Sequence, residues 1–511
     1  MTLLPAILLQ TIPQATDYVR ILPELILSAF GIVIMLLDPL VDEEKSQKTF
    51  GIIGFFATLA GLTATWFMSK SPGLAFSASI HVDSFTVFFN YLVIAIAAVV
   101  ILSSFEYMAV QRIRAGEYYA LILFGVVGMS LMASAVELVL VFIGLEISSI
   151  STYILAGFRR NDASSSESSL KYFLLGSFAT AFFLYGVALM FGATGSTNID
   201  IIAQKLQSAP VEVLVFLAMA LMFVGLGFKV AAAPFHIWTP DVYEGAPAPV
   251  VGFMSTAPKA AAFAVLLRVV FAINAPGRFW FLWVAAALSM TLGNIGALVQ
   301  NNVKRLLAYS SIAHAGYLLV AFAMTTPDDS VTGISAAMFY TAAYAAMNVG
   351  AFAVVSHFAN AGERHVTLED YEGLGRTSPL LAATLTVFLL SLIGIPMTGG
   401  FFAKFYVFSA ALRANLVWLT LIGVVNSAIG AYYYLRIIVV MYMRESRKEV
   451  PVTPIPLGLG LALALSILAT LYLGILPNRV LQIAQRSAQN LIASQTASVA
   501  QTPPATASPL Q

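Results

Sequence analysis

The chain has 511 residues, of which 59% are hydrophobic and only 10% charged, and its mean hydropathy is +0.87 with a net charge of +1. Soluble proteins carry about 25% charged residues, so this composition excludes a soluble enzyme and predicts an all-α polytopic membrane protein. The small net charge gives no sign of a nucleic-acid partner. The absence of cysteine excludes disulfides, thiolate chemistry and cysteine-held zinc or iron–sulfur sites.

Fourteen segments of the chain are apolar enough to cross a bilayer, for which a helix needs about 20 residues. In chain order they are 21–40, 49–68, 84–105, 118–135, 137–158, 168–192, 212–236, 248–272, 279–299, 303–324, 332–358, 380–411, 416–442 and 455–476. The stretch from Ala484 to Gln511 is small and polar, and we expect it to form a loose tail.

Basic residues are unevenly divided between the loops on the two sides of the membrane. Fourteen spans place both termini on one side. If the termini face outward, the inward loops hold thirteen lysines and arginines and the outward segments hold seven. Because cytoplasmic loops are enriched in these residues, we expect both termini on the periplasmic side. The thirteen are Lys45, Lys48, Arg112, Arg114, Arg159, Arg160, Lys304, Arg305, Arg364, Arg376, Arg444, Arg447 and Lys448.

The spans show signs of an internal duplication. The seventh segment carries Lys229 shortly before Pro234, and the twelfth carries Pro396, two glycines and Lys404. The eighth and thirteenth segments both end in an arginine flanked by aliphatic residues. Both pairs are five spans apart, and an odd offset reverses the orientation in the membrane. The pattern therefore predicts two inverted five-helix repeats, which are typical of transporters.

Glu146 and Lys229 are ionisable residues in the middle of predicted spans. An ionised group at this depth costs about 2.5–3.5 kcal/mol on insertion scales, and a carboxylate and an ammonium offset part of that cost by approaching each other. We expect Glu146 to pair with Lys229, and the pair to store and release a proton as the carboxylate moves. The alternative is a static structural ion pair.

Two prolines predict interruptions in the seventh and twelfth helices. Pro234 and Pro396 each remove a backbone hydrogen bond and displace a carbonyl group. Freed carbonyls at membrane depth are tolerated only where protein or water meets them. A broken helix beside Lys229 or Lys404 is therefore a natural place for water to reach a protonatable group.

Further polar residues extend this set across the middle of the membrane. Lys259 and Lys404 lie deep in their segments and, with Lys229 and His314, predict a lateral proton relay. Packing is the alternative role for Lys259, and a single hydrogen bond to a carbonyl is the alternative for His314. Three polar residues of segment 332–358 are expected to contribute: Tyr340, Tyr344 and Asn348.

Other charged residues are expected nearer the ends of the spans. Lys171 begins its segment after a polar loop, so we expect it near the inner surface, as a possible relay residue or a solvated charge. Asp241 and Glu244 follow the seventh segment, as an ordinary solvated loop or a point of proton uptake. Arg268 and Arg436 lie near span ends and can extend to the interface.

Four long motifs resemble the antiporter-like membrane subunits of respiratory complex I, and among them the subunit N group. They are GFKVAAAPFHIWTPDVYEGAPAPV, NNVKRLLAYSSIAHAGYLL, SLIGIPMTGGFFAKFYVF and GLEISSISTYILAGF, and the resemblance extends from about residue 20 to 476. Sister subunit M commonly has glutamate where this chain has Lys404, and the polar tail does not supply the long lateral helix of sister subunit L. The segments within 21–105, which the vertebrate form lacks, favour a bacterial source.

The resemblance implies a specific organisation and site. It implies fourteen helices, with the seventh and twelfth broken, and two inverted repeats flanked by additional helices. The divisions are 1–117, 118–272 (first repeat), 273–442 (second repeat) and 443–511. By position, it implies proton transfer at Glu146, Lys229, Lys259 and Lys404.

The function that the resemblance implies belongs to an assembly. The chain would lie in the bacterial inner (plasma) membrane beside other membrane subunits, and would couple NADH oxidation and quinone reduction elsewhere to proton movement. FMN, iron–sulfur clusters, NADH and quinone would bind in or near other subunits, so we expect no cofactor and no redox catalysis in this chain alone. One alternative is a subunit of a multisubunit cation/proton antiporter, and another is a structural spacer that does not conduct.

Overall fold

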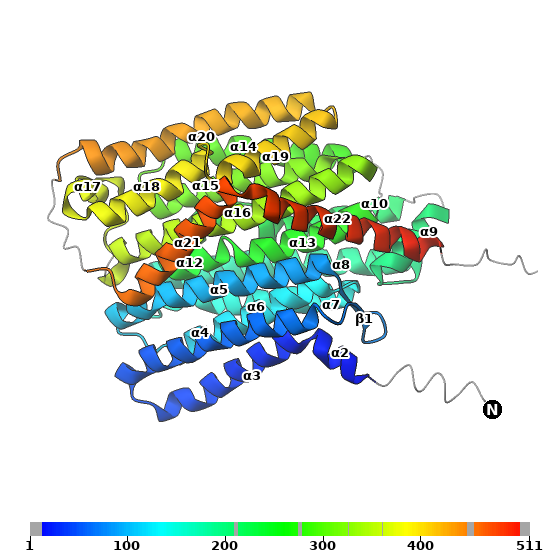
Figure 1. Cartoon of the computed structure of the whole chain (residues 1–511), viewed down its shortest axis with the longest axis horizontal. Helices are drawn as coiled ribbons and strands as arrows, with labels where there is room; N and C mark the ends of the chain where they lie inside the picture. Colours follow the sequence, from blue (N-terminus) through cyan, green and yellow to red (C-terminus); the bar gives the residue numbers. More distant parts are fainter. Residues whose placement is uncertain are drawn as a thin grey trace, which may run out of the picture.

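The computed structural model describes residues 13–208, 213–273, 278–324, 327–359, 361–446 and 454–500. In these ranges thirteen helical segments are long and apolar enough to span a bilayer, and they run side by side as one bundle (Figure 1). The remaining predicted span, the twelfth (380–411), is present as two shorter helices, α18 (Pro379–Ile393) and α19 (Gly399–Arg413). The prediction of an all-α polytopic membrane fold is confirmed.

The bundle consists of long helices joined by short elements. The long helices are α3 (Leu22–Leu37), α4 (Glu43–Met68), α5 (Ser84–Gln111), α6 (Gly116–Ser134), α7 (Leu138–Ala156), α8 (Ala163–Thr194), α10 (Val213–Val230), α13 (Ala257–Ala272), α14 (Arg278–Leu298), α15 (Val303–Val320), α16 (Pro327–Ala359), α20 (Val417–Met443), α21 (Leu457–Ile475) and α22 (Pro477–Ala500). The short helices are α2 (Ala15–Arg20), α9 (Ile199–Ser208), α11 (Trp238–Gly245), α12 (Ala248–Met254) and α17 (Leu374–Thr377), with 3-10 turns η1 (Asp38–Leu40), η2 (Ala321–Ala323), η3 (Ala361–Glu363) and η4 (Leu368–Tyr371). Strands β1 (Gly73–Ala75) and β2 (Ile80–Val82) pair antiparallel.

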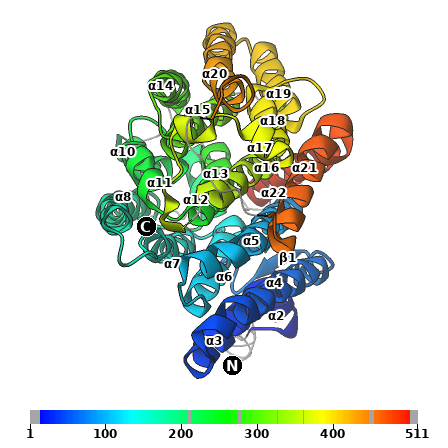
Figure 2. The ribbon, with the colours of Figure 1, turned by 90° about the vertical axis from the view of Figure 1, so that its left-hand side faces the viewer.

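The core of the bundle is formed by α13, α15 and α16, which are buried on nearly all sides. Helices α3 and α4 lie at one edge, against α5 and α6 (Figure 1). The view along the bundle shows α8, α13, α15 and α20 following one another across it (Figure 2). Side chains on these helices can therefore form a row that crosses the molecule parallel to the membrane.

The seventh predicted helix is broken, as expected. Helix α10 ends where Ala231 adopts a left-handed φ of 59°, and Pro234 follows in the irregular segment. The carbonyl oxygen of Phe228 accepts a hydrogen bond from Trp238 Nε1 (3.0 Å), at the start of α11. A side chain of the protein thus satisfies backbone that the break exposes, which is the condition for an interrupted helix at membrane depth.

The twelfth predicted helix is also broken. Helix α18 ends at Ile393, and Gly394 adopts a φ of 94° that side-chain-bearing residues rarely take. The two halves approach so closely that a Cβ added at Gly400 would lie 1.8 Å from the carbonyl oxygen of Ser391. The glycines in this segment are therefore required by both the turn and the packing.

A third interruption lies in segment 248–272, which we expected to be one continuous helix. The structure has α12 and α13 there, separated at Thr256, whose φ of −125° and ψ of −67° are not helical. Pro258 lies in the first turn of α13, where a missing N–H costs little because those amides have no partner within the helix. The proline therefore marks a helix start, and Lys259 lies in the first turn.

The predicted loose tail is wrong for the part that the structure describes. Residues Pro477–Ala500 form helix α22, which packs against α5, α9 and α16 (Figure 1). Its buried face is Ala484, Ser487, Ala488 and Leu491. This face recurs with helical spacing, and Val480, Leu481 and Ile492 pack beside it, so the sequence carries an amphipathic pattern that its many alanines, serines and glutamines obscured. Residues 501–511 of the tail lie outside the described part.

Arg268 does not extend to the membrane surface as expected. It is 3% exposed, and its guanidinium donates to both carboxylate oxygens of Asp83 (3.0 and 3.2 Å) and to Thr86 Oγ1 (2.7 Å). Burial acts to raise the pKa of Asp83, but the charge of Arg268 opposes this, and the net effect is a lowered pKa. The ion pair joins the end of α13 to the start of α5.

Candidate functional site

Lys229 lies in the last turn of α10, beside the break, and is 4% exposed. Its Nζ lies 4.9 Å from the ring centroid of Tyr153 and 5.3 Å from that of Tyr172. The same nitrogen is buried without a hydrogen-bond partner. The ammonium is therefore surrounded by aromatic faces, an arrangement that stabilises a cation by about 0.5–2 kcal/mol.

Glu146 lies on the neighbouring α7, close enough for its charge to interact with Lys229. Its Oε1 is buried and, like Lys229 Nζ, has no hydrogen-bond partner. The direct contact that we expected between them is not formed in this structure. Two buried groups with unused hydrogen-bonding capacity, facing the same small region, are suited to a bridging water.

Lys259 makes its contacts with α15. Its Nζ donates to Ser311 Oγ (2.5 Å) and to the carbonyl oxygen of Ser311 (3.3 Å), and the residue is 3% exposed. A cavity with a water-accessible volume of about 10 Å³ lies here, lined by Lys259, Ser311, His314 and Tyr344 among others. This volume holds about one water. The first turn of a helix is an unfavourable place for a cation.

His314 lies between two of the lysines. Its Nδ1 lies 2.7 Å from Tyr340 Oη and its Nε2 lies 3.3 Å from Tyr434 Oη. The charges of both Lys259 and Lys404 act on it. The histidine is therefore bonded through both ring nitrogens to tyrosines, rather than to a backbone carbonyl, and one of those hydroxyls must accept while the other donates when the ring is neutral.

Lys404 lies in α19 and reaches back to the end of α18. Its Nζ donates to the carbonyl oxygens of Leu392 (3.0 Å) and Ile393 (2.8 Å) and to Ser427 Oγ of α20 (2.9 Å). It also lies 5.1 Å from the ring centroid of Tyr317. The lysine thus satisfies two carbonyls that the break leaves without intrahelical partners.

A stack of aromatic rings separates Lys229 from Lys259. The rings of Tyr172 and Trp238 stack with centroids 4.4 Å apart, and Trp238 meets Tyr243 edge-on at 6.0 Å. The hydroxyl of Tyr243 is buried without a hydrogen-bond partner and lies close to Ser311. Lys259 and His314 line one small cavity and the charge of Lys404 acts on His314, whereas the link from Lys259 to Lys229 is aromatic.

Lys171 lies at the surface end of α8, with its side chain 41% exposed. It forms ion pairs with Glu167 (2.7 Å) and Asp241 (2.8 Å). Arg305 bonds Asp241 (2.8 Å) and Glu244 (2.7 Å) in the same network. The structure thus places Lys171 among solvated charges and does not bring it together with Lys229, Lys259 and Lys404.

Replacing Lys171 by glutamine is expected to change proton translocation less than about twofold, because surface ion pairs contribute only about 0–1 kcal/mol. The measurement is acidification of vesicles that contain the assembled complex, with the thermal stability of the complex as a second readout. A tenfold loss with unchanged stability would show that Lys171 carries protons.

A buried ion pair was missed by the sequence analysis, which counted Lys304 among the loop residues. Lys304 is fully buried, and its Nζ donates to Glu363 Oε2 (2.5 Å) and to the carbonyl oxygen of Ala246 (2.6 Å). Glu363 also accepts from Tyr107 Oη (2.8 Å) and from the backbone N–H of Ala248 (2.6 Å). The sequence signal was a lone glutamate in a short polar segment, which is ordinarily solvated.

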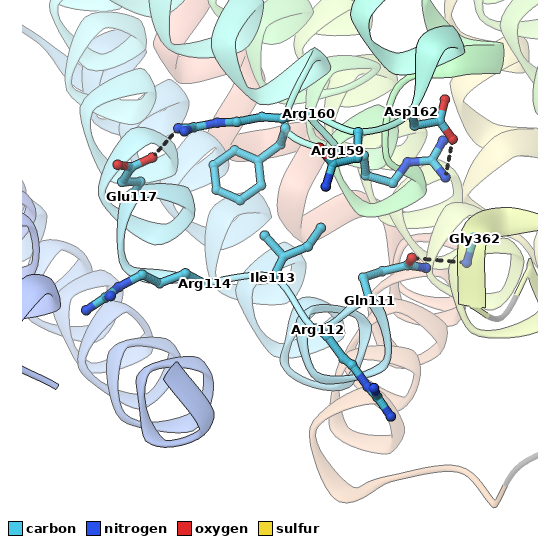
Figure 3. Close-up of a pocket in the computed structure, with 11 residues that line it drawn as sticks. Gln111, Arg112, Ile113, Arg114, Glu117, Arg159, Arg160, Asp162 and Gly362 are labelled. Carbon is cyan, nitrogen blue, oxygen red and sulfur yellow. Dashed lines mark hydrogen bonds and ion pairs between the residues drawn. The ribbon is translucent and has the colours of Figure 1, made fainter. Parts of the chain in front are cut away.

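The end of the bundle at the loops α5–α6 and α7–α8 has a cavity of about 470 Å³, whose lining includes four arginines: Arg112, Arg114, Arg159 and Arg160. Figure 3 shows their side chains diverging. Arg160 bonds Glu117 (2.7 Å), Arg159 contacts Asp162 (3.3 Å) and Arg114 bonds Asp38 (3.0 Å). Three of the four are thus already paired with carboxylates, which is unlike a site built to converge on one anion.

Comparison with curated proteins places the chain among respiratory membrane subunits. A family profile described as "NADH:quinone oxidoreductase/Mrp antiporter, TM" matches residues 135–430. NADH-quinone oxidoreductase subunit N 2 of Koribacter versatilis is 66% identical, over 93% of this chain and 98% of its own length. NADH-quinone oxidoreductase subunit N of Trichlorobacter lovleyi is 45% identical, over 91% and 96%.

Comparison with solved structures gives the same assignment to respiratory membrane subunits. A chain of respiratory complex I from Thermus thermophilus is 38% identical, with a TM-score of 0.77 over 91% of this chain and 99% of that chain. A chain of the Mrp complex from Dietzia sp. has a TM-score of 0.80 over 94% and 99%, but at 22% identity it shows the shared fold alone. The chain belongs to the NADH:quinone oxidoreductase/Mrp antiporter family and, within it, to the subunit N branch of NADH-quinone oxidoreductase.

Proposed function

We propose that this chain moves protons through the row Glu146, Lys229, Lys259, His314 and Lys404, driven by NADH oxidation and quinone reduction in other subunits of its complex. The observation that carries the proposal is that Lys229, Lys259 and Lys404 are buried without an ion-pair partner among the described residues. Each is at most 8% exposed, and none forms an ion pair within the part of the chain that the structure describes. Their contacts are aromatic rings, hydroxyls and carbonyl oxygens, all of which tolerate a neutral amine.

Two other buried cations in this molecule, which have a structural role, differ from these three lysines. Arg268 and Lys304 are equally buried, and each is bonded directly to a carboxylate, Asp83 or Glu363. A buried charge that serves only the fold is held by its counter-ion, because removing one partner is strongly destabilising. The absence of such a partner at the three lysines favours groups that gain and lose a proton over static ion pairs.

The orientation and the repeats remain part of the proposal. We infer that the arginine-lined end faces the cytoplasm and that both termini face the periplasm, because the basic residues gather at that end. The two inverted repeats, 118–272 and 273–442, are supported by broken helices five spans apart, each with a lysine near the break. FMN, iron–sulfur clusters, NADH and quinone would be held by or near other subunits.

The test is replacement of Lys259 by methionine in the purified complex, reconstituted into vesicles. We expect proton translocation to fall about tenfold or more, since a single proton-transfer group contributes about 10²–10⁴ to a rate. Vesicle acidification and NADH oxidation by quinone are measured together. Unchanged acidification in a stable variant would contradict the proposal.

The same vesicles distinguish redox-driven proton translocation from the alternative function, cation/proton exchange by an antiporter subunit. A chain that exchanges cations for protons would acidify or alkalinise vesicles in response to a sodium gradient, without NADH. We expect no such response, and acidification only when NADH and quinone are both present.

A further inference from the structure

A groove lies on the surface between α7 and α8, and one of its lining residues, Tyr153, has Lys229 Nζ beside its ring. It has a volume of about 490 Å³ and is lined by the polar residues Tyr153, Arg160, Ser166 and Ser169, by Gly157, and by the apolar residues Ile154, Leu170 and Phe173. Tyr153 comes from α7, and the other polar residues come from the loop between the two helices and from the first two turns of α8. The groove therefore opens at the arginine-bearing end of the bundle.

Tyr153 forms the inner wall of this groove. The residue is 5% exposed, and its hydroxyl is buried without a hydrogen-bond partner. The hydroxyl packs over Gly176 of α8, where an added Cβ would lie 2.0 Å from Tyr153 Oη. Its ring lies under Lys229 Nζ, 4.9 Å from the centroid. One side chain thus borders the groove on one side and the buried lysine on the other.

The spacing along α7 directs the hydroxyl of Tyr153 toward Glu146. Residues 146, 149 and 153 lie three and four positions apart, so they share one face of the helix. Helical side chains lean toward the N-terminus of their own helix, which is the direction from Tyr153 to Glu146. Ser149 lies between them, and its Oγ donates to the carbonyl oxygen of Leu145 (2.5 Å).

Three polar atoms without hydrogen-bond partners therefore lie in one region: Glu146 Oε1, Tyr153 Oη and Lys229 Nζ. Buried polar groups in proteins are nearly always satisfied. A cluster of orphaned atoms beside a groove is consistent with water that reaches them when the site is in use. Tyr153 and Lys229 are 5% and 4% exposed, and Glu146 is partly exposed, so all three groups lie close to the surface of the groove or just beneath it.

We propose that the hydroxyl of Tyr153 passes protons between water in this groove and the Glu146–Lys229 site. This inference rests on the proposed function and adds the point where protons are exchanged with the inner side. A water that enters from the groove and reaches Tyr153 Oη gives it a proton, while the hydroxyl gives its own proton, directly or through one water, to Glu146. The tyrosine ends neutral, and the net change is one proton moved from the groove to Glu146.

The first test is Tyr153→Phe in the intact complex. Phenylalanine keeps the ring under Lys229 and the packing on α8 but removes the hydroxyl. We expect coupled NADH:quinone turnover and vesicle acidification to fall about tenfold, with a larger solvent deuterium isotope effect, since the lost group takes part in proton transfer. Tyr185→Phe is the matched control, because Tyr185 lies on α8 and is 60% exposed. Activity and isotope effect equal to those of the control would overturn the inference.

The second test uses the absence of cysteine in this chain. Ser169→Cys places a thiol in the groove, and a membrane-impermeant methanethiosulfonate is applied from either side of the vesicle. We expect modification from the arginine-bearing side, followed by loss of turnover, whereas Ser177→Cys on the lipid-facing side of α8 stays unmodified. A Ser169→Cys thiol that does not react, or that reacts without loss of turnover, would contradict the groove as the proton path.

The proposed proton path through Lys229 and the groove beside Tyr153 can be tested separately. If Lys229→Met stops translocation while Tyr153→Phe and the modified Ser169→Cys do not, the groove is not the route and the proposed function stands. If Lys229→Met leaves translocation intact, the proposed function fails first, and this inference fails with it.

Discussion

Replacing Lys229 by methionine is expected to lower proton translocation and NADH:quinone turnover together by about tenfold or more. Methionine is close to lysine in length and fills the same space, so the packing against Tyr153 and Tyr172 is kept and the protonatable amine is lost. Because Lys229 Nζ has no hydrogen-bond partner in the structure, its removal leaves no bonded group unsatisfied. The measurement is the initial rate of vesicle acidification per NADH oxidised, with the yield of assembled complex as a stability check.

The matched control for Lys229→Met is Lys70→Met. Lys70 is an exposed lysine that follows α4, with its Nζ 5.1 Å from the ring centroid of Trp66. It is the same chemical change at a solvated position, so activity should be retained. Loss of function in both variants would point to a general effect of charge, and loss in neither would remove Lys229 from the proton path.

Replacing Glu363 by alanine is expected to destabilise the subunit by about 3–5 kcal/mol, because it leaves Lys304 buried without its counter-ion. Glu363 also accepts hydrogen bonds from Tyr107 and from the first backbone N–H of α12, so α5, α12 and α15 lose a common anchor. We expect a strongly reduced yield of assembled complex and a lowered thermal midpoint. The measurement is thermal unfolding in detergent, with the yield per cell as a second readout.

The double variant Glu363→Leu with Lys304→Met shows whether the destabilisation comes from the unpaired charge of Lys304 or from the other contacts of Glu363. Replacing both members of a buried ion pair by apolar residues is often neutral or stabilising, so the double variant should recover most of the lost stability. Recovery would identify the uncompensated ammonium as the cause. A double variant as unstable as Glu363→Ala would show that the hydrogen bonds to Tyr107 and α12 matter more than the charge.

The ion pair of Lys304 and Glu363 makes the stability of the subunit depend on pH. Burial acts to raise the pKa of Glu363, but Lys304 and Arg159 outweigh it, and the pKa is lowered. A carboxyl group with a lowered pKa in the folded state contributes stability that is present above its unfolded pKa, about 4.3. That contribution is lost as the pH falls through the lower folded value. In the double variant Glu363→Leu with Lys304→Met, which has no carboxylate at this position, we expect this loss of stability at low pH to be absent.

Much of the fold could be predicted because membrane-spanning helices are recognised by length and apolar composition alone. The breaks beside Lys229 and Lys404 followed from proline and glycine in otherwise apolar segments. The break at Thr256 did not, because a proline in a first turn looks the same in a sequence whether it begins a helix or interrupts one. Helix α22 was missed because its few large apolar residues stand among many alanines, serines and glutamines, and such residues are equally common in loose tails.

The candidate site could be proposed from the sequence as a set of residues but not as a geometry. A charge within a span is costly enough to single out Glu146, Lys229, Lys259 and Lys404 without any contact information. What each one touches depends on side chains from distant helices, such as Ser311 for Lys259 and Ser427 for Lys404. The ion pair of Lys304 and Glu363 joins residues 59 positions apart in the chain, and only the folded bundle brings them together.

The stacked rings of Tyr172 and Trp238 have a consequence for the timing of transfer along the proposed row. The rings meet face to face with centroids 4.4 Å apart, and ring faces supply neither a donor nor an acceptor through which a proton can hop. Under the proposed function, charge therefore passes between Lys229 and Lys259 only when the rings move apart or water enters between them. A smaller side chain in place of Trp238 would leave room for such water and join the two lysines permanently.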